Sequence, residues 1–488
     1  MFKKVEHHPR LDFKFTFEVD IDPNNRWVKL SKMIPWQTIE ERYAGNFEKL
    51  KGRKAKPIRM ALGALIIQQK CGFTDRETVD QITENPFLQY FIGLTEYQSK
   101  PPFDASLMVH FRKRFTPEML AEINNEIING PNNDDDGSPP GGGLHSDKTK
   151  AQSGASFETY PTNKGKLILD ATCVPADIRY PMDLSLINEA REKLDKLIDF
   201  VHNALGKTSK RPRTYRKNAR KAFLTMIRNK KPKKKLTRKA IGQQLRFVRR
   251  NRYALSCMLE ATADNPVLSP KQQETLDTID KLFIQQMTMY ENRTHHIENR
   301  IVSISQPHVR PIVRGKSGVP VEFGAKVAIS MVEGYTYIEK LSWDAFNESA
   351  ILVESVESYR RQHGCYPEAV QADKIYRTRS NIRYCEDREI RLSGPRLGRP
   401  TTSKTKQREL LRLERLDNSE RNAVEGKFGE GKRRYSMDRI MAKLRDTAEC
   451  VIYLQILVMN MEHSLRILLR VFLERIFRRN SETLRFAA

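Results

Sequence analysis

The sequence predicts an α/β protein: a mixed sheet flanked by helices, preceded by a helical N-terminal domain and interrupted by a large basic helical insertion. Two apolar runs, 166–172 and 368–373, have the composition of strands, whereas apolar residues over 57–67 form the broad face of a helix. Residues 207–252 are rich in lysine and arginine and contain no aspartate or glutamate. Because 488 residues exceed what one hydrophobic core usually serves, two or three domains are expected.

The first 130 residues are predicted to form the helical N-terminal domain. Thr74 and Glu77 have the spacing of cap residues at the start of a helix, following the apolar helix over 57–67. Residues 131–163 follow as a flexible linker, because aspartate, proline and glycine dominate its first part and no apolar period is present.

The α/β domain that contains the sheet is predicted to comprise 164–185 and 305–450, with an insertion over 186–304. Asp183 is placed to cap a helix that continues to about residue 205, and a further helix is expected over 271–300. The insertion therefore begins and ends with helices that surround the basic stretch.

The sheet is expected to resume after the insertion. Strands over 321–332 and 335–341 are joined at Glu333 and Gly334, a short turn between β-rich runs. A helix over 348–362 then leads to the strand that closes at Asp373.

The C-terminal residues 451–488 are predicted to form a helix that packs on this α/β domain. The apolar run 451–461 is too short and too polar to span a bilayer, because Gln455 and Asn460 interrupt it. Residues 1–8 lack the apolar core of a signal peptide, and the six cysteines show no zinc-binding spacing. A cytoplasmic, nucleoid-associated protein without a membrane partner is expected.

The net charge of +26 and the pI near 9.7 favour a polyanionic partner, with nucleic acid the first candidate and an anionic membrane the second. The basic stretch is interpreted as an arm that follows DNA phosphates, although a solvated charged face is the alternative. Its predicted phosphate contacts are Arg213, Arg216, Lys217, Arg220, Lys221, Arg246, Arg249 and Arg250.

Three acidic residues are the candidate catalytic and metal-binding groups: Asp170, Asp373 and Glu425. Both aspartates close predicted strands, and Arg421, Glu425 and Lys432 fall close to one face of a helix. Two metal ions about 3.5–4 Å apart need hard oxygen ligands on separate rigid elements, which this arrangement supplies. One such carboxylate alone is more often a cap or a surface charge, so the prediction depends on all three together.

Three glycines in the same helix, Gly426, Gly429 and Gly431, each cost about 1 kcal/mol relative to alanine. They predict a close approach, either of a DNA backbone or of the sheet surface.

These residues resemble bacterial insertion-sequence transposases of the DDE type, in the branch whose last catalytic helix carries Tyr-x2-Arg-x3-Glu-x6-Lys. Arg421, Glu425 and Lys432 keep those spacings, whereas Asn418 replaces the tyrosine. Segments 169–174, 310–316, 321–326 and 341–348 also look like family blocks.

The resemblance implies a ribonuclease-H-like catalytic fold and a DNA transposase that binds terminal inverted repeats. It implies hydrolysis at the element ends and attack of the freed 3′-hydroxyl on target DNA, with two Mg²⁺ ions for which Mn²⁺ may substitute. Arg421 and Lys432 are implied DNA contacts, the partner is double-stranded DNA, and pairing of two ends implies a homodimer. The alternatives are a metal-dependent nuclease without strand transfer and a non-catalytic DNA-binding remnant.

Overall fold

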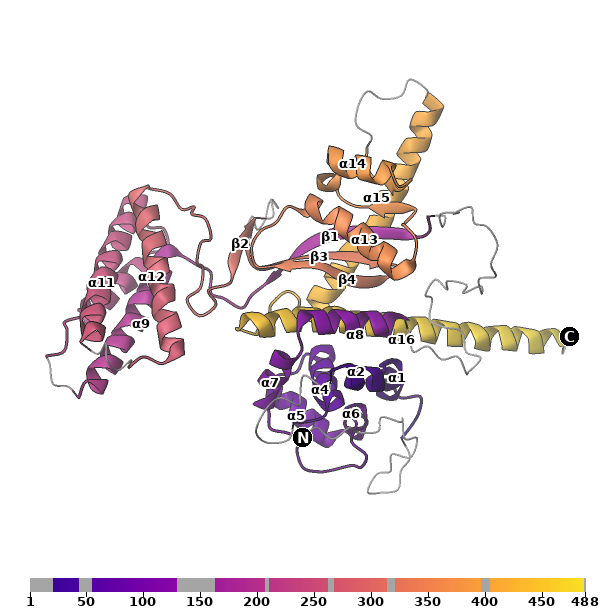
Figure 1. The fold of residues 1–488 in the computed structure, drawn as a ribbon, viewed down its shortest axis with the longest axis horizontal. Helices are drawn as coiled ribbons and strands as arrows, with labels where there is room; N and C mark the ends of the chain where they lie inside the picture. Colours follow the sequence, from indigo (N-terminus) through magenta and orange to yellow (C-terminus); the bar gives the residue numbers. More distant parts are fainter. Residues whose placement is uncertain are drawn as a thin grey trace, which may run out of the picture. The chain divides into compact units, whose positions relative to one another are not determined.

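The structure is a computed structural model that describes residues 21–43, 55–129, 163–206, 210–261, 267–313, 321–395 and 404–486. The predicted linker, apart from Asn163, lies outside the described residues. The chain divides into two compact units (Figure 1). The first comprises Met1–Val174, Val327–Leu341 and Phe346–Ala488, and the second comprises Pro175–Lys326 and Ser342–Ala345.

The N-terminal part of the first unit is helical, as predicted, and α4 (Ile58–Cys71) is its most buried element. All residues from Ile58 to Ile67 are buried, so the broad apolar face was a correct indication of a core helix. The predicted cap is also confirmed, because the Thr74 hydroxyl and the Glu77 carboxylate form a capping box at the start of the next helix. The other helices are α1 (Arg26–Met33), α2 (Trp36–Tyr43), α5 (Asp75–Glu84), α6 (Pro86–Phe91), α7 (Leu107–Arg114) and α8 (Pro117–Asn129).

Over the described ranges, the sheet has six strands, in the order β2 (Arg310–Val313), β3, β1, β5 and β6, and β4 pairs with β3. β1 runs parallel to β5, with Leu167 opposite Val370, and β5 runs parallel to β6. Helix α13 precedes the short strand β5, α14 lies between β5 and β6 in the sequence, and α15 follows β6; these helices cover the sheet (Figure 1). The bounds are β1 (Lys166–Pro175), β3 (Val321–Val332), β4 (Tyr335–Ser342), η1 (Glu348–Ile351), α13 (Leu352–His363), β5 (Ala369–Gln371), η2 (Lys374–Tyr376), α14 (Arg379–Glu386), β6 (Arg391–Leu392) and α15 (Lys404–Arg434).

The turn between β3 and β4 is the predicted hairpin. Glu333 and Gly334 have φ angles of 51° and 86°, and positive φ at both central residues is the requirement of a type I′ turn. The predicted helix after this hairpin is also present, although its first turn, η1, is a 3-10 turn.

The C-terminal helix α16 (Arg445–Phe486) packs against α4, α7 and α8 in the first unit (Figure 1). It also reaches the sheet, because Asn460 accepts the backbone N–H of Thr336 in β4 at 2.9 Å. Among the described residues, no helix is long and apolar enough to cross a membrane.

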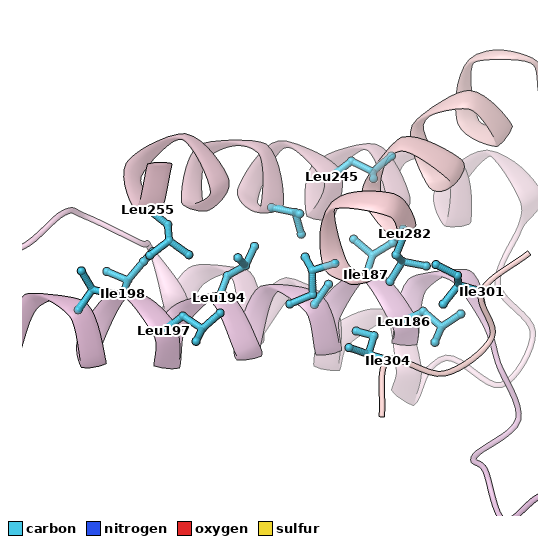
Figure 2. Packing of buried hydrophobic residues seen from close by; sticks show 14 of the residues in the cluster. Leu186, Ile187, Leu194, Leu197, Ile198, Leu245, Leu255, Leu282, Ile301 and Ile304 are labelled. Carbon is cyan, nitrogen blue, oxygen red and sulfur yellow. The ribbon is translucent and has the colours of Figure 1, made fainter. Parts of the chain in front are cut away.

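The second unit contains a helical core, shown in Figure 2. Leu194 and Ile198 of α9 pack with Leu245 and Leu255 of α11 and with Leu282 of α12. The bounds are α9 (Asp183–Ala204), α10 (Arg216–Arg228), α11 (Lys234–Glu260), α12 (Pro270–Glu291) and β2 (Arg310–Val313), the last paired antiparallel with the start of β3.

Two predictions about this unit are wrong. Asp183 is not the cap of α9, since the N-cap is Met182 and the Asp183 carboxylate instead accepts from Arg300 at 2.7 Å and from Gln286 at 3.0 Å. The helix expected over 271–300 ends at Glu291, because Arg293 and Asn299 adopt positive φ angles that a helix cannot contain.

Candidate active site

Asp170 lies within β1 and not at its end. The strand was expected to close at this carboxylate, but it continues to Pro175, because the β-rich residues after Asp170 remain in the sheet and Thr172 to Val174 are buried. The Asp170 side chain is half-buried, and its Oδ1 accepts the N–H of Ala171 at 2.8 Å.

Asp373 follows the neighbouring strand, β5, as predicted. Ile168 of β1 is opposite Gln371 of β5 in a parallel pair, so continuing this register by two residues brings Asp373 level with Asp170. Asp373 is also the N-cap of η2, where its Oδ1 accepts the N–H of Lys374 at 2.6 Å. The carboxylate is 55% exposed and therefore accessible.

Helix α15 is anchored to the strands by two acidic residues that the sequence did not single out. Asp417, which is 4% exposed, forms an ion pair with Arg391 of β6 and accepts from Gln371 of β5 at 3.1 Å. Glu420 accepts from Lys166 of β1 at 2.8 Å. Their partners lie on three different strands, so these contacts fix α15 against the sheet. The sequence signal was only that Asp417 and Glu420 lie just before Arg421.

The anchored helix brings Arg421 to the aspartates. Its Nη1 lies 3.6 Å from Oδ1 of Asp373. Glu425 follows one helical turn later and is exposed, and Lys432 lies about two turns beyond it and is half-buried. The predicted common face of Arg421, Glu425 and Lys432 is therefore present on one continuous helix.

Negative charge is concentrated at Asp170. The pKa of Asp170 is raised to about 6. Burial is the main cause and the carboxylates of Glu348 and Asp373 add to it, whereas the Ala171 N–H and Arg421 lower the pKa. Burial likewise raises the pKa of Tyr376, with contributions from the same three carboxylates. Glu348 is thus a further acidic group at this site, and no local pattern of residues singled it out beforehand.

A buried amide holds the two turns that carry Glu348 and Asp373. The Nδ2 of Asn381 donates to the carbonyls of Ser349 and Tyr376, each at 2.8 Å. This bridge joins η1, which begins at Glu348, to η2, which begins after Asp373. The positions of both carboxylates consequently depend on Asn381.

The donor set at Asp170 and Asp373 fits a hard divalent cation, because carboxylate oxygens are the ligands that Mg²⁺ and Mn²⁺ prefer. The pKa of Asp170 is raised mainly by burial and to a smaller extent by the carboxylates of Glu348 and Asp373, and a bound cation would favour the charged form against both effects. Across the part of the chain that the structure describes, however, no three Asp, Glu, His or Cys side chains are already gathered as a metal site. Asp170 and Asp373 are brought together, and Glu425 is not yet gathered with them.

The predicted phosphate contacts of the basic stretch lie in the second unit, on and just before α10 and on α11. Most are exposed, but Arg216 is half-buried and pairs with Asp199 of α9 at 2.9 Å. Arg250 lies over the ring of Tyr215 at 4.5 Å. The acidic partners missing from the stretch itself are therefore supplied by α9 and, for Arg252, by Asp280 of α12. The exposed members are Arg213, Lys217, Arg220, Lys221, Arg246, Arg249 and Arg250.

Two segments of the chain match known protein families. Residues 370–462, which include Asp373, Arg421 and Glu425, match the family described as "Transposase DDE domain". The chain carries a transposase DDE domain. Residues 15–114 match a second family, "Transposase domain (DUF772)". The resemblance to DDE transposases is thereby confirmed, by the DDE match over 370–462 and by a transposase match on a second, separate segment.

One curated relative of this transposase is an uncharacterized protein, ORF8 in the nfe locus of Rhizobium meliloti. It is 28% identical over 185 residues, which are 37% of this chain and 77% of that protein. No solved structure matches the chain.

Proposed function

We propose that this transposase cleaves DNA at the ends of its element and joins the freed 3′-hydroxyl to target DNA by two-metal phosphoryl transfer. The observation that carries the proposal is the meeting of Asp170, Asp373 and Arg421, from two parallel strands and a facing helix, within a chain that carries a transposase DDE domain. The ribonuclease-H-like fold belongs to the same proposal. It is supported by the strand order β3, β1, β5, β6, with β4 paired to β3 and with β1, β5 and β6 parallel.

In this proposal Asp170 and Asp373 hold the two Mg²⁺ ions, for which Mn²⁺ substitutes, and Glu425 completes the second site. When bound, the ions activate the attacking oxygen and stabilise the departing one. With a pKa near 6, Asp170 is mostly ionised at neutral pH and able to bind a cation, whereas below about pH 6 a proton competes with the metal for the carboxylate. Arg421 holds Asp373 in the resting protein and is available to a DNA phosphate when a cation replaces it.

The DNA is held, in the same proposal, by cations on both units. Lys432 lies on the catalytic face of α15, and the exposed residues of α10 and α11 contact the phosphate backbone. Such contacts carry no sequence information. Recognition of the terminal repeats is therefore assigned to the N-terminal helices, and pairing of two ends requires a homodimer.

The test is a cleavage and joining assay on a linear duplex that carries the DNA flanking the coding region. With Mg²⁺, the wild-type protein is expected to cut at the element end and to join the product to a plasmid. Asp170→Asn and Glu425→Gln should each lower the cleavage rate about 1,000-fold, which corresponds to about 4 kcal/mol of transition-state stabilisation, while DNA binding is retained.

Other outcomes separate the alternatives. Cleavage without any joined product indicates a metal-dependent nuclease, and DNA binding with no cleavage by the wild-type protein indicates a non-catalytic remnant. Unchanged cleavage by Asp170→Asn would contradict the assignment of the site.

A further inference from the structure

A basic cleft lies between α15 and α16 in the first unit. It has a volume of about 610 Å³ and is lined by Lys427, Glu430, Arg433, Arg434, His463 and Arg466. Four cationic side chains thus surround a single carboxylate. None of these residues belongs to the site around Asp170.

The cleft and the catalytic residues occupy different faces of α15. At 100° per residue, Lys427 and Arg434 are about 140–160° around the helix axis from the face that carries Arg421 and Glu425. The same helix therefore carries Arg421 and Glu425 on one face, and Lys427 and Arg434 of the cleft on another.

The floor of the cleft is fixed and its rim is exposed. Lys427 is only 11% exposed on its side chain, and its Nζ lies 3.6 Å from Glu430, which Arg466 also contacts at 2.7 Å. Arg433 and Arg434 are exposed. An anion that enters the cleft meets guanidinium groups that hydrogen-bond phosphate oxygens well and a lysine held at the bottom.

The remaining wall is also held in place. The ring of His463 packs edge-on against Tyr335 at 4.8 Å, and its Nε2 lies 3.2 Å from the carbonyl oxygen of Glu333 in the β3–β4 turn. A side chain at Gly334 would collide with this ring. The cleft is therefore a preformed feature of the unit.

We infer that this cleft binds the phosphate backbone of a second DNA duplex, the target, while the catalytic face of α15 holds the element end. The inference rests on the proposed function, because that reaction has two DNA partners and the helix has two separate faces for them. The lining is mainly cationic, as a site for backbone phosphates requires, and phosphate contacts carry no sequence information. That property suits a target and not a terminal repeat.

The test compares the full-length protein with the double variant Arg433→Gln/Arg434→Gln. Its matched control is Arg360→Gln/Arg361→Gln, which removes a second arginine pair from the last turn of a helix, α13, of the same unit. The probe is a random-sequence duplex of about 30 base pairs, or three helical turns, titrated over a range of salt concentrations. Thermal unfolding of all three proteins verifies that each is folded.

The cleft variant should bind the random duplex about tenfold more weakly, and the slope of log affinity against log salt should become less steep by about 2, the value for two lost phosphate contacts. Cleavage of the element end should stay within about twofold, whereas joining to target falls about tenfold. The control should match the wild-type protein in every assay.

Random-duplex binding and a salt slope equal to those of the control would overturn the inference. An equal loss of end cleavage and joining would overturn the assignment to target DNA. If the wild-type protein neither cleaves nor joins, the proposed function fails, while the binding titration still decides whether the cleft contacts DNA.

Discussion

Arg421 Nη1 lies 3.6 Å from Oδ1 of Asp373, so a cation on α15 is already beside the carboxylate that is proposed to hold a metal ion. The guanidinium and an incoming divalent ion compete for the same oxygen. Removal of Arg421 should therefore strengthen metal binding even as it weakens DNA processing.

Arg421→Gln is expected to tighten Mn²⁺ binding to the DNA-free protein by about tenfold. Two opposite charges at the separation of Arg421 and Asp373 attract each other by about 4 kcal/mol near a protein surface. Because Asp373 is exposed, solvent screens much of this attraction. A remaining effect of about 1.4 kcal/mol corresponds to the expected tenfold change in the dissociation constant. Calorimetric titration measures it, with Arg415→Gln on the same helix as an exposed control. A dissociation constant equal to that of the wild type would mean that Arg421 does not occupy Asp373 in solution.

The ion pair of the buried Asp417 with Arg391 should be a main contributor to the docking of α15. Asp417→Asn is expected to lower the free energy of unfolding by about 2 kcal/mol, because the hydrogen bonds to the buried carboxylate become weaker and Arg391, which is 34% exposed, loses its counter-ion. Urea unfolding measures the change. Glu409→Gln, an exposed acid of the same helix, should alter stability by less than about 0.5 kcal/mol.

Gly431 and Gly426 should respond in opposite ways to the same change. A Cβ at Gly431 would collide with the sulfur of Met437 and lie 3.2 Å from that of Met459, and both methionines are buried. Gly431→Ala should therefore destabilise the protein by about 1–3 kcal/mol through overpacking. No atom lies within 4 Å of a Cβ at Gly426, so Gly426→Ala should stabilise the helix by about 0.5–1 kcal/mol.

Thermal unfolding of the two alanine variants provides the comparison. Equal shifts in the same direction would contradict the assigned role of the contact with Met437. The sequence predicted that a DNA backbone or the sheet surface closely approaches these glycines. At Gly431 the neighbours are instead two methionine side chains, Met437 and Met459, the second of which belongs to α16.

Asn460 should be important for the contact between α16 and β4. It accepts the N–H of Thr336 and donates to the Thr336 carbonyl at 2.7 Å and to Asn124 at 2.8 Å. Asn460→Ala removes these three buried hydrogen bonds and should cost about 2–3 kcal/mol. Chemical denaturation checks this value, and Asn422→Ala, at an exposed position of α15, should cost nothing measurable.

Local sequence signals predicted the local structure well. The capping box at Thr74, the core helix α4 and the hairpin at Glu333 and Gly334 each depend on residues close together in the chain, and all three are confirmed. The cap assigned to Asp183 was wrong because its partner Arg300 lies more than 100 residues away, a contact that no local pattern reveals.

The same distinction applies to the candidate site. The chemistry of Asp170 and Asp373 could be proposed from strand-like runs, but the continuation of β1 beyond Asp170 could not, since a strand's end depends on its neighbours in the sheet. Glu348 was not predicted because its approach to Asp170 depends on the η1 and η2 turns that Asn381 joins.

The parallel pairing of β1 with β5 has a consequence for synthesis on the ribosome. Lys166 pairs opposite Ala369, so at about 5–20 residues per second the nascent β1 segment waits roughly 10–40 s for this neighbour to be translated. During that interval its apolar face and backbone edge are open to other polypeptides. Chaperone occupancy of nascent chains should therefore begin when β1 leaves the exit tunnel and decline once β5 has emerged.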